Sequence, residues 1–135
     1  MNIFENVYVY TTALYSVAGL LIILGLALFE LTTRYKNWEH IKSGNIAVAL
    51  ATGGKIIGLA NIVHFAVQGE ERVGSIFLES AFGFLLLIST YWIFEFLTPN
   101  LPVDREIENG NIAVGIISCA LSIGMSYVIG SALVG

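Results

Sequence analysis

The sequence has very little charge. Of its 135 residues, only 12% are Asp, Glu, Lys or Arg, whereas 56% are apolar, and the mean hydropathy is +0.81. A soluble domain keeps about a quarter of its residues charged, because water must solvate its surface. This composition excludes such a surface. It predicts a chain whose main surroundings are the lipid bilayer.

The residues that most often carry catalysis, metals or nucleic acid are also scarce. The six Lys and Arg residues are scattered and form no basic patch, which argues against nucleic acid as a partner. The two histidines lie too far apart for a metal site, and Cys119 has no second cysteine for an internal disulfide. No nucleophile–base pairing or phosphate-binding loop is recognisable. We therefore expect neither an enzyme nor a cofactor.

Four apolar runs are long enough to cross a bilayer, which takes ~20 residues in a helix. They are Val7–Phe29, Ile46–Gln68, Val73–Leu97 and Ile112–Val134. Only residues 69–72 join the second run to the third, so these two runs are expected to form a tight antiparallel hairpin. The sequence predicts an all-α membrane protein with one membrane domain, residues 1–135, and four transmembrane helices.

One stretch of the sequence occurs twice. Residues 41–63 align with residues 107–129 at an offset of 66 positions, and 8 of these 23 pairs are identical. Phe29-Glu30 and Phe94-Glu95 extend the repeat backwards, with an offset of 65. Because each copy contains two spans, the copies have the same orientation. We predict two tandem, like-oriented helical hairpins, repeat one about 1–68 and repeat two about 73–135, related by a pseudo-twofold axis along the membrane normal.

The basic residues predict the orientation of the chain in the membrane. The connections at 30–45 and 98–111 carry Arg34, Lys36, Lys42 and Arg105, whereas the opposite side carries only Arg72. Loops rich in Lys and Arg stay in the cytoplasm. Both connections are therefore expected to be cytoplasmic and both termini to lie outside.

The doubled motif resembles a known family. Each copy contains Ile-x-x-Gly-Asn-x-Ala, from Ile41 to Ala47 and from Ile107 to Ala113. This arrangement is similar to the bacterial inner-membrane family of domain of unknown function three-fifty, a duplicated two-helix unit, and the resemblance covers nearly the whole chain. It implies a small multi-pass protein of the bacterial inner membrane without established chemistry. The resemblance also implies a link to membrane stress, because some family members are encoded near phage-shock-like membrane-stress proteins. The family defines no catalytic residues.

The repeated residues at the cytoplasmic side have two interpretations each. The pairs Gly44-Asn45 and Gly110-Asn111 provide a tight turn and a helix N-cap, and two adjacent helix N-termini would also suit a lipid phosphate or an acidic partner segment. Glu30 and Glu95 lie about one turn inside their helix ends. They either pair with Arg34, Lys36 or Arg105, or face each other across the pseudo-axis as a cation or proton site.

Three ionisable residues lie within the spans. Lys55 falls near the bilayer midplane. Inserting a cation at this depth costs a free energy of ~2.5–3.5 kcal/mol, so an ionisable residue there suggests a functional role. Its repeat counterpart is Leu121, and we expect the lysine to point into the bundle or into an oligomer interface. His64 falls level with Glu79, which favours either a proton relay or a pair that satisfies its own polar groups.

A narrow face of small residues predicts how the helices pack. The second run carries Gly54, Gly58 and Asn61 at helical spacing, and the fourth carries Gly115, Cys119 and Ser122. Small residues let helix backbones approach closely in lipid. We expect the second and fourth helices to pack together at the pseudo-axis or between subunits. Lining a pore is the alternative.

Two functions from different classes follow. The first is a non-enzymatic, homo-oligomeric membrane module that acts with a cytoplasmic membrane-stress protein. The alternative is an oligomeric channel or transporter for ions or protons that uses Lys55, Glu79 and His64. Four short helices do not enclose a path alone, so this alternative requires several subunits.

Overall fold

The computed structural model describes residues 6–32, 37–69 and 72–134, and within these ranges all regular structure is helical. The helices are α1 Val7–Thr32, α2 Asn37–Lys42, α3 Ile46–Gly69, α4 Val73–Leu97, α5 Val103–Glu108 and α6 Ile112–Val134. Four of them, α1, α3, α4 and α6, are long and apolar enough to cross a membrane. The predicted class, an all-α membrane protein with four spans, is confirmed.

The two polar connections contain short helices that the sequence did not predict. Helices α2 and α5 are each six residues long, and their bounds differ by the same 66 positions as the repeat. Both end in a left-handed glycine, Gly44 with φ 90° and Gly110 with φ 87°. The repeat therefore includes a short helix before the glycine corner of each copy.

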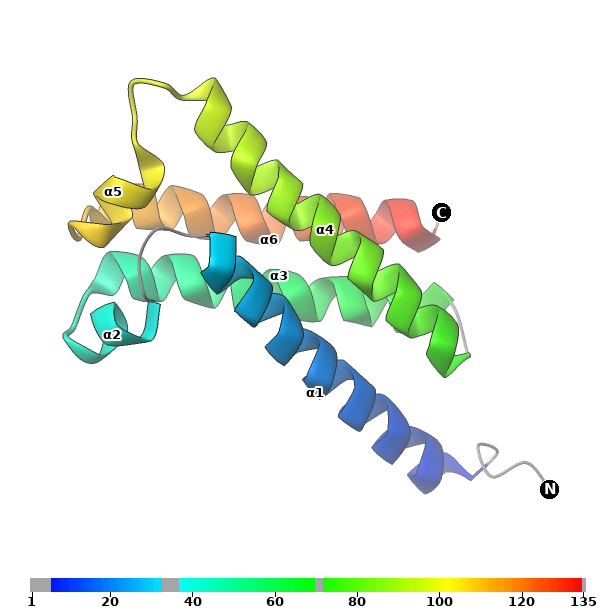
Figure 1. The fold of residues 1–135 in the computed structure, drawn as a ribbon. Helices are drawn as coiled ribbons and strands as arrows, with labels where there is room; N and C mark the ends of the chain where they lie inside the picture. The colour runs from blue at the N-terminus through cyan, green and yellow to red at the C-terminus, as the bar shows by residue number, and fades with distance from the viewer. Residues whose placement is uncertain (1–5, 33–36, 70–71, 135) are drawn as a thin grey trace.

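Helices α3 and α6 lie side by side and run in the same direction (Figure 1). Their backbones approach closely because small residues face each other. A Cβ atom added to Gly54 would lie 2.6 Å from Cys119 Cα, and one added to Gly115 would lie 2.8 Å from the Ala47 carbonyl oxygen. Near the far end of the pair, Asn61 Nδ2 donates to Ser126 Oγ at 3.1 Å.

Helices α1 and α4 cross one face of the α3–α6 pair as a second layer (Figure 1). Gly25 of α1 faces Leu59 and Phe84, and Gly83 of α4 faces Ile62 of α3. Helix α1 is packed less than the others, since only 17% of its most apolar stretch is buried, compared with 56% for α3. Its N-terminal half projects away from the bundle.

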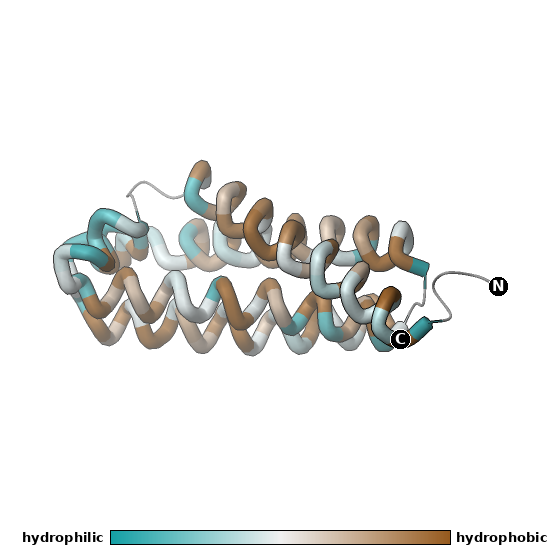
Figure 2. The backbone as a smooth tube through the Cα atoms, turned by 90° about the horizontal axis from the view of Figure 1, so that it is seen from below, coloured by the Kyte–Doolittle hydropathy of each residue, from teal (hydrophilic) through white to brown (hydrophobic). Residues whose placement is uncertain are grey.

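Hydrophilic residues gather at the end of the molecule that carries α2 and α5, while the four long helices are largely hydrophobic along their length (Figure 2). This distribution is typical of a chain with its polar connections at one membrane surface. Arg34 and Lys36, which contribute to the predicted orientation, lie outside the described residues. The orientation and the division into two tandem hairpin repeats stay predictions.

Candidate functional site

Lys55 is enclosed between the two helix layers. Its side chain is fully buried, with 0% of its surface exposed. The ammonium Nζ lies 5.2 Å from the ring centroid of Phe29 on α1 and 5.0 Å from that of Tyr91 on α4. A cation over an aromatic face is attracted by the ring quadrupole, and this attraction is stronger where water is excluded. Lys55 therefore points into the bundle of a single copy.

An acidic residue completes the cluster around Lys55. The Tyr91 hydroxyl donates a hydrogen bond of 2.6 Å to Asp104 Oδ1, and Asp104 is only 3% exposed. The Asp104 carboxylate also attracts the Lys55 ammonium electrostatically. Opposite charges interact strongly where the dielectric constant is low. We call Phe29, Lys55, Tyr91 and Asp104 the lysine cluster, and it joins α1, α3, α4 and α5.

The three polar members of the lysine cluster all break the repeat. Lys55 corresponds to Leu121, and Asp104 corresponds to Trp38 at the offset of 66 positions. Tyr91 corresponds to Leu26 at the offset of 65. The chain has therefore placed three polar departures from its own repeat in one buried cluster, and the equivalent positions of the other half hold apolar or aromatic residues.

Sequence reasoning identified Lys55 but not Tyr91 or Asp104. Depth along the two helices, counted from the connection at 69–72, predicts that Lys55 lies level with Leu87 or Ile88. The flexible lysine side chain instead reaches the ring of Tyr91, one turn closer to α5. Tyr91 and Asp104 share one sequence signal, since each is a polar residue whose repeat counterpart is apolar or aromatic.

The other two intramembrane ionisable residues lie apart from the lysine cluster. His64 is on the exposed side of α3, where its ring packs edge-on against Phe65 with centroids 5.7 Å apart. Glu79 is half-buried on α4. Across residues 6–32, 37–69 and 72–134, no hydrogen bond or ion pair joins His64 to Glu79. His64 and Glu79 are therefore not directly bonded within the described residues of one copy, and the proton relay stays a prediction.

Each Gly-Asn pair ends one helix and begins the next. At the first corner, the Gly44 amide donates to the Ile41 carbonyl at 3.0 Å and the Asn45 amide to the His40 carbonyl at 2.9 Å. The same two bonds recur from Gly110 and Asn111. This pattern closes a helix through a left-handed residue, which glycine adopts without a steric penalty.

The two asparagines cap their helices in the same way but donate to different partners. Asn45 Oδ1 accepts from the Val48 amide at 3.1 Å, and Asn111 Oδ1 accepts from Val114 at 3.4 Å. Asn45 Nδ2 donates across the repeat to the Glu108 carbonyl at 2.8 Å. Asn111 Nδ2 donates instead to Glu106 Oε2 at 2.9 Å, within its own copy.

Carboxylates lie beside both corners. Glu106 bonds Asn111 directly, and Glu108 Oε1 lies 3.8 Å from His40 Nε2. A carboxylate beside a helix N-terminus satisfies the partial positive charge that an anion would otherwise bind. The bonds made by these side chains favour the capping interpretation over a phosphate site.

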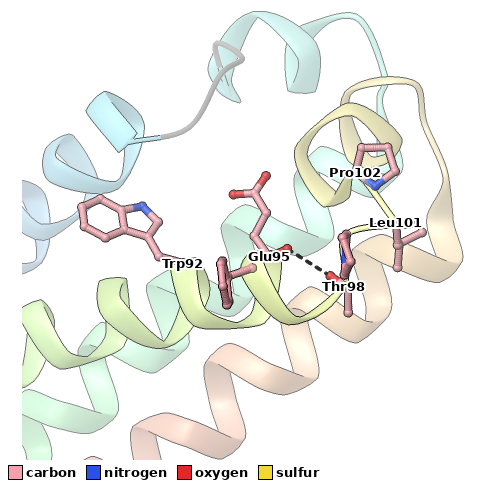
Figure 3. A pocket seen from close by; sticks show the side chains of 7 residues that line it. Trp92, Glu95, Thr98, Leu101 and Pro102 are labelled. Atoms are coloured by element: carbon pink, nitrogen blue, oxygen red, sulfur yellow. Dashed lines mark hydrogen bonds between the residues drawn. The ribbon is translucent and has the colours of Figure 1, made fainter.

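Glu30 and Glu95 are both half-buried near the ends of α1 and α4. Glu95 points into a shallow hollow where α4 gives way to α5 (Figure 3). The hollow is lined by Trp92, Glu95, Phe96, Thr98, Pro99, Leu101 and Pro102. That the two glutamates face each other across the pseudo-axis stays a prediction.

The packing residues named from the sequence lie in the α3–α6 contact. Gly54 faces Cys119, Gly115 faces Ala47, and a Cβ added to Gly58 would lie 3.0 Å from the Ser122 carbonyl oxygen. Asn61 bonds Ser126 in the same contact. These residues therefore hold α3 against α6 within one copy.

Four apolar spans around a buried lysine cluster define a multi-pass α-helical membrane protein. The chain belongs to the family Domain of Unknown Function (DUF350), whose profile matches residues 3–133. It is 46% identical over 132 residues to the UPF0719 transmembrane protein YshE of Bacillus subtilis (strain 168), which covers 98% of each chain. No solved structure matches this chain. The family resemblance drawn from the sequence is confirmed.

Proposed function

We propose that this protein is a non-enzymatic membrane module that self-associates in the bacterial inner membrane, with both termini outside, and acts through a partner at its cytoplasmic surface. The observation that carries the proposal is the placement of Lys55. The one cation near the middle of the spans is enclosed by Phe29, Tyr91 and Asp104 inside a single copy. Such a cluster joins four helices within one copy, which supports a structural role for Lys55.

The partner class is a cytoplasmic membrane-stress protein, and the surface offered to it is the end of the molecule at α2 and α5. Trp38 of α2 is 55% exposed there, beside Glu39 and Lys42. Exposed aromatic residues are frequent anchors of protein interfaces. Together with the acidic corners, this end supports a partner that presents apolar and basic side chains.

Purification of the tagged chain from stressed and unstressed cells tests the partner. A cytoplasmic membrane-stress protein should copurify, and Trp38→Ala should reduce its yield by about tenfold or more, the effect of a hot-spot residue. Tyr15→Ala is the matched control, because Tyr15 is 80% exposed on the N-terminal half of α1. Equal yields from the two variants would contradict a docking role for α2.

The second candidate function is transport of protons or ions through an oligomer. It is favoured by the exposure of His64 on α3, because copies arranged around an axis would bring several histidines together. Liposomes that hold pH- and potassium-sensitive dyes separate the two functions. The module predicts no flux above empty liposomes. Flux that Glu79→Gln or His64→Leu abolishes would reverse the ranking.

Native mass measurement in lipid nanodiscs tests self-association itself. A discrete homo-oligomer supports the proposal. A mass of one copy under conditions that keep the fold intact would contradict it.

A further inference from the structure

The two helix faces that form the α3–α6 contact within one copy have repeat-equivalent faces on the outer surface of the same copy. We infer that copies assemble side by side into a closed ring by repeating this contact, α6 of one copy against α3 of the next. The inference rests on the proposed self-association, and it specifies the surface and the symmetry.

The contact within one copy uses different faces of the two helices. The face of α3 is made by Ala47, Gly54, Gly58 and Asn61. The face of α6 is made by Gly115, Cys119, Ser122 and Ser126. The faces are not equivalent under the repeat, so the contact is of the head-to-tail kind, which forms rings or filaments rather than symmetric pairs.

Because the chain is duplicated, each helix also carries the counterpart of the other helix's face. The counterparts on α6 are Ala113, Ala120, Gly124 and Tyr127. The counterparts on α3 are Ala49, Gly53, Ile56 and Ala60. All are exposed except Gly53, which is partly exposed, and a Cβ added to Gly53 or Gly124 would meet nothing within 4 Å. Because Ala120 and Ala49 stand where Gly54 and Gly115 allow the close approach within a copy, the contact between copies is the same pairing of faces at a wider helix separation.

The corners support the same pairing of copies. Asn45 donates to the carbonyls of Ile107 and Glu108 in the other repeat. The equivalent acceptors for Asn111 are the carbonyls of Ile41 and Lys42 in a neighbouring copy. Within one copy, Asn111 bonds its own Glu106 instead.

The ion pair at the first corner has a repeat-equivalent pair of residues that also carry opposite charges. His40 and Glu108 approach to 3.8 Å across the repeat. Their repeat equivalents are Glu106 and Lys42, so Glu106 of one copy would meet Lys42 of the next. Two opposite charges at this position make the new contact complementary rather than repulsive.

The geometry favours a closed ring. Contact partners such as Gly54 with Cys119 and Asn61 with Ser126 are separated by nearly the repeat offset of 66 positions, so the copies shift little along the helix axis. The two faces of α3 lie roughly 130–140° apart around the helix, on the side away from α1 and α4. A ring with this corner angle closes at about eight helices, which corresponds to about four copies.

The loose packing of α1 also fits a missing neighbour. Helix α4 packs on both α3 and α6, and 33% of its most apolar stretch is buried. Helix α1 packs on α3 and α4, and its buried share is 17%. Helix α1 corresponds to α4 under the repeat, so it should also pack on two long parallel helices. The second of these would be α6 of the adjacent copy.

Disulfide trapping in membranes tests the inference. In a Cys119→Ser background, Gly53→Cys and Ala120→Cys occupy the counterparts of Cys119 and Gly54, which face each other directly across the contact. The wider separation that Ala120 imposes between copies suits the Cα separation of a disulfide, ~4.4–6.8 Å. The double variant should give a ladder of oligomers on oxidation. Coexpressed single variants should stop at the dimer, and each single variant alone should stay monomeric. A disulfide dimer from one single variant would show a symmetric interface and overturn the ring.

Substitution of two repeat-equivalent glycines provides a matched pair that does not depend on oxidation. Gly124→Leu should lower the oligomer mass to that of one copy without changing the thermal midpoint of the detergent-solubilised monomer, because Gly124 faces open space. Gly58→Leu should lower that midpoint, because Gly58 packs against Ser122 within the copy. An unchanged oligomer mass for Gly124→Leu would overturn the inference.

Charge reversal tests the corner. Lys42→Glu should weaken the oligomer, and Lys42→Glu with Glu106→Lys should restore it. The interface would be refuted if the double variant did not restore the oligomer and the cysteine pair gave no crosslink while the native mass was still oligomeric. Self-association itself would then stand. A native mass of one copy would refute both.

Discussion

Lys55, Tyr91 and Asp104 are best understood as one unit, because a buried charge is costly unless an opposite charge or a hydrogen bond compensates it. The two aromatic rings face the ammonium, and the Tyr91 hydroxyl donates to the carboxylate. Removal of one member leaves the others buried without their compensation. A single substitution in the lysine cluster should therefore lower the free energy of unfolding by more than the lost packing of one side chain.

Replacement of Lys55 by the residue at its repeat counterpart tests this coupling. Lys55→Leu should lower the free energy of unfolding by about 3–5 kcal/mol, because it leaves the Asp104 carboxylate buried without its cation. The double variant with Asp104→Leu should recover most of that loss. Denaturant unfolding in detergent measures both, and Arg105→Ala, an exposed neighbour, is the control. A loss below about 1 kcal/mol for Lys55→Leu would contradict the coupling.

The sequence predicts that Lys55 points into the bundle or into an oligomer interface, but it does not identify the partner. Position along a helix fixes the depth of the Cα atom, whereas a lysine side chain reaches well beyond its own turn. Asp104 lies in the charged connection at 98–111, where the sequence does not mark it as buried. Only the folding of α5 against the bundle turns this carboxylate inward, and six residues carry too little periodicity to predict that helix.

At the scale of elements, long apolar runs are the easiest feature to predict. The starts of all four spans and the ends of α4 and α6 agree with the structure, while α1 continues three residues beyond Phe29 and α3 one residue beyond Gln68. The doubled Gly-Asn motif marked both corners. It did not reveal α2 and α5, whose ends depend on backbone hydrogen bonds that leave no mark other than the glycine.

The left-handed glycines predict a specific sensitivity of the corners. Gly110→Ala should lower the free energy of unfolding by about 1 kcal/mol, because an alanine is strained at φ 87°. Gly74→Ala, in the helical first turn of α4 with open space around it, should be neutral or stabilising by up to about 1 kcal/mol. Thermal unfolding of both variants in the same detergent measures the difference. Equal midpoints would mean that the glycine corner is not required.

At the scale of the whole molecule, the predicted duplication accounts for the likeness of the two halves and for its limits. Helices α3 and α6 run in parallel and both glycine corners lie at one end (Figure 1), as the predicted repeat requires. The lysine cluster exists only once, since its repeat counterparts are not charged. The repeat therefore builds the frame of the molecule, and the departures from the repeat build its buried polar centre.

The most direct test of this account is the sidedness of the two corners. In a Cys119→Ser background, single cysteines at the exposed positions Ser43 and Asn109 are treated with a membrane-impermeant maleimide in intact and in opened cells. Both should react only after the cells are opened, whereas a cysteine at Gly74, near the opposite end of the bundle, should react in intact cells. Reaction of the two corners from opposite sides of the membrane would contradict the parallel arrangement of α3 and α6.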